Sequence, residues 1–202
     1  MATNKNAFEF RAKSFTMATP WPAGGFIKVQ FTLRVLAMVL SSAGLVTMLN
    51  SVETVNFFGI SMRASYTYSS AFKFVMVADA IACASSLLSL VLAFMLSRSE
   101  PNPSSYFAVF LHDLVLALLM MAGCGAATGV GMVAREGIEQ VGWSPICDHV
   151  GKFCNKVAIS IAFSFMVLLC YLALAVSSAN KLKYLARGTN NQVAEGGVTQ
   201  ER

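Results

Sequence analysis

Four long apolar runs constrain this sequence more than any other feature. They lie at about residues 27–49, 71–96, 106–130 and 157–178. A helix needs about 20 mostly apolar residues to cross the hydrocarbon core of a bilayer, and each run reaches that length. Backbone N–H and C=O groups in lipid must be satisfied within the chain, so the runs are predicted to be helices. The sequence predicts an all-α membrane protein with a four-helix transmembrane domain at 27–178, an N-terminal tail at 1–26 and a C-terminal tail at 179–202.

The composition agrees with a membrane protein. Of the 202 residues, 56% are hydrophobic and 12% are charged, whereas soluble domains carry about 25% charged residues. This excludes a disordered tail, a collagen-like rod and a nucleic-acid-binding domain with a charged surface. The net charge of +5 comes from positive residues beside the apolar runs, so membrane lipids are the expected partners and nucleic acid is not.

The distribution of Lys and Arg predicts the orientation. Nine of the fifteen Lys and Arg residues lie in the tails or near helix ends on the same side of the membrane as the tails. Five lie on the other side, and the remaining one, Arg34, is within a helix. Cytoplasmic segments carry the excess of positive residues. Both termini are therefore predicted to be cytoplasmic, and the loops near 50–70 and 131–156 are predicted to face outward.

Two charged residues are expected to pair inside the membrane. Arg34 lies seven residues into the first run and Asp113 seven residues into the third. Both helices should run from the cytoplasm outward, which places both charges roughly 10 Å deep. A planar guanidinium can hold a carboxylate by two hydrogen bonds, which suits a buried site. We predict a structural ion pair that fixes which helices pack together.

Three further ionisable side chains are expected within the membrane: Lys73, Asp79 and His112. Asp79 should lie about 10 Å nearer the outer leaflet than Arg34, and its expected partner is Lys73 or a hydroxyl group. A proton or ion path through Asp79, His112 and Asp113 is the functional alternative. We favour the structural interpretation, because the polar groups are scattered and neighbouring helix positions such as 112 and 113 point about 100° apart.

Small residues recur at four-residue spacing in the third run. They are Gly123, Gly125, Ala127, Gly129 and Gly131. Small side chains let helix backbones approach closely in lipid. The pattern fits packing within one chain and packing between chains equally well.

The second outer loop contains two of the five cysteines, Cys147 and Cys154. The exterior is oxidising, so they are expected to form a disulfide, within one chain or between two. A zinc site with His149 is less favoured, because it lacks a fourth ligand. Trp143 could pack on the bridge or lie at the membrane boundary.

Motifs for catalysis or nucleotide binding are not found in the sequence. The two histidines, His112 and His149, are expected on opposite sides of the bilayer, and neither has a nucleophile and an orienting acid beside it. We expect a protein that is not an enzyme and that holds no cofactor and no metal.

Several of these residues together resemble the plant Casparian strip membrane domain protein family. They are Arg34, Asp113, the stretch Ser-Ser-Ala-Phe-Lys-Phe at 69–74, and the loop with Trp143, Cys147 and Cys154. The chain looks most like the CASP-like group, subfamily 1, over about 28–178. It departs from the family's pattern at Asp79, where the family often has Asn, and in the first outer loop.

The resemblance implies a multi-pass protein of the plasma membrane that forms homo-oligomers and hetero-oligomers with related family members. Some members build membrane platforms that recruit enzymes for local cell-wall modification. The leading hypothesis is therefore a non-enzymatic scaffold that organises membrane subdomains. The alternative is a small proton- or ion-coupled transporter or channel. A claudin-like junction protein ranks last, because claudins carry the Trp-Cys-Cys motif in the first outer loop.

Overall fold

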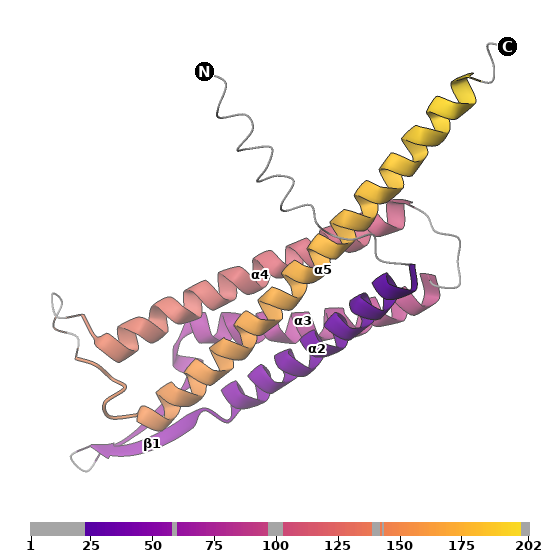
Figure 1. Cartoon of the computed structure of the whole chain (residues 1–202). Coiled ribbons are helices and arrows are strands. Elements are labelled where there is room, and N and C mark those ends of the chain that lie inside the picture. The colour runs from indigo at the N-terminus through magenta and orange to yellow at the C-terminus, as the bar shows by residue number, and fades with distance from the viewer. Residues whose placement is uncertain (1–22, 58–59, 97–102, 139–141, 143, 199–202) are drawn as a thin grey trace, which may run out of the picture.

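The part of the chain that the structure describes contains four long helices, as the sequence predicted. The computed structural model describes residues 23–57, 60–96, 103–138, 142 and 144–198. The helices are α2 (Ala23–Leu49), α3 (Ser70–Leu96), α4 (Pro103–Glu136) and α5 (Gly151–Val198) (Figure 1). All four are long and apolar enough to cross a membrane. The expected fold class, an all-α membrane protein with four transmembrane helices, is confirmed.

The helices form a bundle in which each packs against two neighbours. Their cyclic order is α2, α3, α4, α5, so that α2 faces α4 and α3 faces α5 across the bundle axis. We call the end that carries the strands and the disulfide the hairpin end. The opposite end, where α2 begins and α5 leaves the bundle, we call the terminal end (Figure 1).

A β-hairpin fills the first connection at the hairpin end. Strand β1 (Val52–Phe57) pairs antiparallel with β2 (Ile60–Ser65), in a register that sets Val52 opposite Ser65. A short 3-10 helix, η1 (Tyr66–Tyr68), leads into α3. The sequence predicted only a loop here, although Val52, Thr54 and Val55 are β-branched residues that favour strands.

Two helices extend beyond the apolar runs that predicted them. Helix α4 continues past residue 130 to Glu136 and stops at Gly137, whose positive φ of 71° terminates helices readily. Helix α5 begins at Gly151, before residue 157, and continues to Val198, through much of the segment predicted as a tail. The helices are longer than the predicted spans because apolarity marks the part of a helix that suits lipid, whereas the helix itself continues until a residue breaks it.

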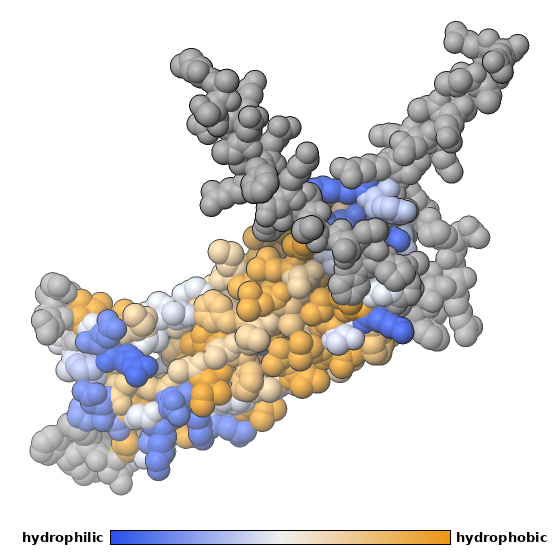
Figure 2. All heavy atoms as spheres, viewed as in Figure 1, coloured by the Kyte–Doolittle hydropathy of each residue, from blue (hydrophilic) through white to orange (hydrophobic). Residues whose placement is uncertain are grey.

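The surface separates into an apolar middle and two hydrophilic ends. In Figure 2 the hydrophobic residues form a band over the helices, with hydrophilic residues at the hairpin end and near the terminal end. Large apolar side chains in this band are exposed, among them Phe31, Leu118 and Met121. A surface of this kind is expected where helices face lipid.

Candidate functional site

An ion pair joins α2 to α4 across the bundle axis. Arg34 Nη2 lies 2.9 Å from Asp113 Oδ2, and the two residues are 2% and 0% exposed. The structure therefore brings together the two charges that the sequence placed at one depth. It differs in one respect, because the two hydrogen bonds expected are reduced to one. Among the described residues, Arg34 Nη1 and Asp113 Oδ1 are buried and have no hydrogen-bond partner.

A second polar contact crosses the other diagonal of the bundle. The hydroxyl of Tyr171 on α5 donates to the carbonyl of Ala82 on α3, at 2.8 Å, and lies 2.8 Å from the hydroxyl of Ser86. Tyr171 is completely buried and is the largest such side chain in the described residues. Sequence reasoning missed it, because a tyrosine in an apolar run looks like one more core residue.

Asp79 lies in a separate polar layer, nearer the hairpin end. Its carboxylate Oδ2 accepts a hydrogen bond of 2.7 Å from the hydroxyl of Ser164, so the partner is a hydroxyl and the structure gives no contact to Lys73, which is exposed. One turn earlier on α5, Ser160 donates to the backbone carbonyl of Gly44, at 2.8 Å. Ser160 and Ser164 stand four residues apart on one helix face, a signal that we overlooked.

His112 does not join these contacts. Its Nε2 atom is buried and has no hydrogen-bond partner among the residues that the structure describes. The ten residues from Arg34 to Gly44 place the layer of Asp113 and the layer of Asp79 roughly 15 Å apart along α2. Within the described part of the chain no hydrogen bond links Asp79 with His112 or Asp113, so these three residues form no continuous file.

The small residues of α4 divide between two faces. Gly123 and Ala127 are buried in the bundle, and a Cβ atom on Gly123 would lie 3.4 Å from the Cα of Val75 on α3. Gly125 and Gly129 point away from the bundle and have no neighbouring atom within 4 Å of an added Cβ. An added Cβ at Gly131 would also have no neighbouring atom within 4 Å among the described residues. Gly123 and Ala127 thus pack within the chain, whereas Gly125 and Gly129 are exposed on its surface.

The hairpin end is held by a disulfide and by two hydrogen bonds to α5. Cys147 and Cys154 form the expected bridge within one chain, so their thiols are not free to bind zinc. The carboxylate of Glu53 on β1 accepts from the backbone N–H of Phe153, at 2.8 Å, and Lys156 donates to the carbonyl of Asn50. An acidic side chain at a helix N-terminus is favourable. Trp143 lies outside the described residues.

Replacing both Cys147 and Cys154 by serine is expected to lower the free energy of unfolding by about 2–3 kcal/mol, because the bridge restricts the unfolded chain. Thermal unfolding in detergent measures the loss, and dithiothreitol should reproduce it in the unmodified protein. Cys83 is not disulfide-bonded, so Cys83→Ser should leave the response to dithiothreitol unchanged. An unfolding temperature that is equal with and without reductant would contradict the prediction.

Comparisons with known proteins agree with the resemblance seen in the sequence. The family model for the Casparian strip membrane protein domain matches residues 23–170. CASP-like protein 1F2 of Ricinus communis is 38% identical over 183 residues, which cover 90% of this chain and 91% of the relative. CASP-like protein 1F1 of the same plant is 41% identical, over 79% of this chain and 89% of the relative.

A more distant relative, CASP-like protein 1F1 of Arabidopsis thaliana, is 34% identical over 77% of this chain and 90% of its own length. No solved structure matches the chain. The matched segment includes all of α2, α3 and α4, with the ion pair of Arg34 and Asp113. This chain is a multi-pass membrane protein and belongs to the CASP-like proteins of the Casparian strip membrane protein domain family.

Proposed function

We propose that this protein is a non-enzymatic scaffold of the plasma membrane that associates laterally with copies of itself and with related family members. The observation that carries the proposal is the outward face of α4. Gly125 and Gly129 stand four residues apart there, with Ala122 and Ala126 also exposed beside them. Small residues at this spacing allow the backbone of a second helix to approach closely in lipid.

The interior of the bundle supports a scaffold over a transporter. The buried charged side chains make contacts between helices: Arg34 with Asp113, and Asp79 with Ser164. Such contacts hold the arrangement of a bundle. A proton path would need a continuous file of polar groups, and the described residues place Asp79 and Asp113 in separate layers.

The two ends of the bundle would serve different partners. The hairpin end, held by the disulfide and by Glu53, presents a compact surface; with the predicted orientation it faces the cell wall, where it would recruit wall-modifying enzymes. The positively charged terminal end would face the cytoplasm and contact anionic lipids.

Lateral association is tested by replacing both outward glycines with leucine. The double variant Gly125→Leu, Gly129→Leu is expected to self-associate about tenfold more weakly, because the leucines hold a partner backbone away. Single-molecule photobleaching in nanodiscs and crosslinking in membranes both report the oligomeric state. The variant should stay folded, because open space surrounds both positions.

A matched control lies on α3, where Ala80 and Ala84 are exposed at the same spacing. The double variant Ala80→Leu, Ala84→Leu should keep the oligomer. If both double variants associate alike, the face of α4 is not the interface. A protein that is monomeric at every concentration, or one that carries pH-dependent flux in liposomes on its own, would contradict the scaffold.

A further inference from the structure

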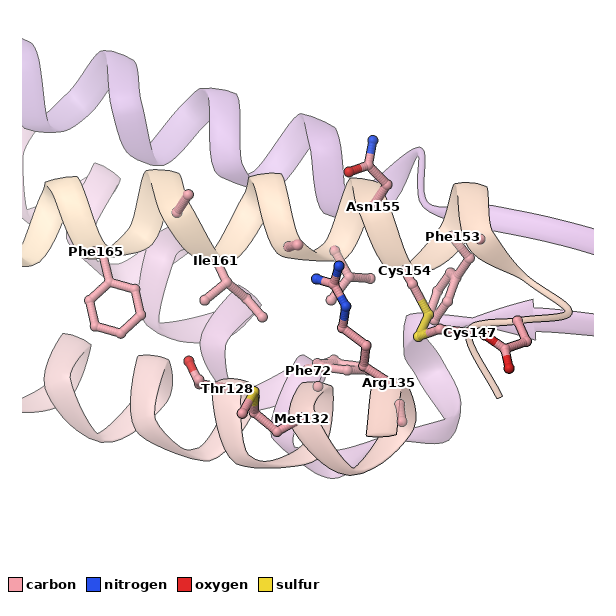
Figure 3. A pocket seen from close by; sticks show the side chains of 17 residues that line it. Phe72, Thr128, Met132, Arg135, Cys147, Phe153, Cys154, Asn155, Ile161 and Phe165 are labelled. Atoms are coloured by element: carbon pink, nitrogen blue, oxygen red, sulfur yellow. A yellow bond between two sulfur atoms is a disulfide. The ribbon is translucent and has the colours of Figure 1, made fainter. Parts of the chain in front are cut away.

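A cavity of about 540 Å³ lies between α4 and α5 at the hairpin end (Figure 3). Its walls are mostly apolar, with Met132 of α4 on one side and Ile161 and Phe165 of α5 on the other. Phe72 of α3 also lines it, and the disulfide of Cys147 and Cys154 lies at its loop end. The volume falls within the range of about 300–1,000 Å³ that is typical of small-molecule sites.

Most of the cavity is lined by the helical segments that are apolar enough to cross a membrane. On α4 it extends from Thr128 to Arg135, and on α5 from Gly151 to Phe165, within two helices that are apolar enough to span a bilayer. These stretches correspond to roughly 10 Å and 21 Å of helix. Met132 and Phe165 line the cavity and are also exposed on the bundle surface. The cavity is therefore open to the acyl chains of surrounding lipid.

The charged side chains among the described lining residues lie toward the loop end of the cavity. The guanidinium of Arg135 points from α4 into the space between the two helices (Figure 3), and the structure shows no ion pair for it within the described residues. Asp148 also lines the cavity and follows Cys147 on the disulfide loop, and Cys147 lies farther toward the loop end than Arg135 (Figure 3). Deeper in the cavity wall, the hydroxyl oxygen of Thr128 is buried and accepts or donates no hydrogen bond within the described part of the chain.

This order of groups matches the chemistry of one kind of molecule. A guanidinium binds phosphate by paired, charge-assisted hydrogen bonds. A carboxylate farther out suits a positively charged amine, and apolar walls farther in suit a hydrocarbon chain. The Thr128 hydroxyl can donate to an ester or hydroxyl oxygen of the occupant. We propose that the cavity binds a zwitterionic phospholipid, with one acyl chain between α4 and α5, the phosphate at Arg135 and the amine toward Asp148.

The test uses the full chain in nanodiscs that contain phosphatidylcholine with a photoreactive diazirine on one acyl chain. After illumination, crosslinked peptides are mapped and quantified by mass spectrometry. The crosslinks are expected in 128–135 and 154–165. Ala162→Phe fills the cavity from its α5 wall and should abolish this labelling. Ala173→Phe, which is exposed on the same helix and lies outside the cavity, should leave it unchanged.

The headgroup is tested separately, so that the proposal stays falsifiable if Ala162→Phe does not fold. Arg135→Gln should lower labelling by the phosphatidylcholine probe about tenfold, the value of one hydrogen bond to a charged group. Labelling by a diacylglycerol probe with the same chain should not change. Free phosphocholine in excess should not compete, because it has no acyl chain.

Three results would overturn the proposal. Equal labelling of Ala162→Phe and Ala173→Phe would place the probe elsewhere on the bundle. Unchanged phosphatidylcholine labelling in Arg135→Gln would show that the cavity does not recognise a phosphate. Competition by free phosphocholine would assign the site to a soluble ligand that arrives from the aqueous side.

Discussion

Replacing Arg34 by alanine is expected to leave the carboxylate of Asp113 buried without its counter-ion, and to lower the free energy of unfolding by about 3–5 kcal/mol. Asp113→Ala should cost a similar amount, because it leaves a buried guanidinium. Both residues are almost completely buried, so water cannot replace the lost partner. Denaturation in mixed micelles measures the loss, and delivery of a fluorescent fusion to the cell surface measures its consequence.

Double variants distinguish the contribution of the ion pair to stability from the contributions of its two residues. Arg34→Asp with Asp113→Arg should partly restore folding and delivery, because opposite charges again face each other. Arg34→Met with Asp113→Leu should recover more, since replacing both members of a buried pair by apolar groups is often neutral. Arg63→Ala changes an exposed residue of the hairpin and should have little effect. Normal delivery of both single variants would show that the pair does not hold the bundle.

The helices and the level of the ion pair could be predicted from the sequence because both depend on local geometry. A run of 20 apolar residues must be helical in lipid. The fixed rise per residue then gives the depth of each side chain. Arg34 and Asp113 have equal predicted depths, and the structure shows them in contact. The disulfide of Cys147 and Cys154 could be predicted because the two residues are close in sequence.

Features that depend on how helices cross could not be predicted. Depth does not say that α2 and α4 face each other across the axis, or that their charges meet through one hydrogen bond. The division of small residues, with Gly123 inside and Gly125 outside, depends on the rotation of α4 about its own axis. The cavity depends on the distance between the end of α4 and the start of α5. No pattern in the sequence gives that distance.

Gly44 shows most clearly how helix crossing selects a residue. A Cβ atom at this position would lie 3.4 Å from Oδ2 of Asp79, 3.6 Å from Cβ of Phe163 and 3.7 Å from the carbonyl oxygen of Ser160. The first neighbour belongs to α3 and the other two to α5. At Gly44, α2 thus packs closely against both neighbours, and the Gly44 carbonyl accepts the hydrogen bond from Ser160.

Gly44→Leu is therefore expected to destabilise the protein by about 3 kcal/mol or more, because a branched side chain must push α5 away and break the contact of Ser160. Gly44→Ala should be close to neutral, since its Cβ makes ordinary van der Waals contacts. Gly125→Leu, with open space around it, should fold normally. Denaturation in mixed micelles compares the three variants under conditions in which the protein is monomeric. Equal stability of Gly44→Leu and Gly125→Leu would mean that α2 and α5 are not in close contact at this level.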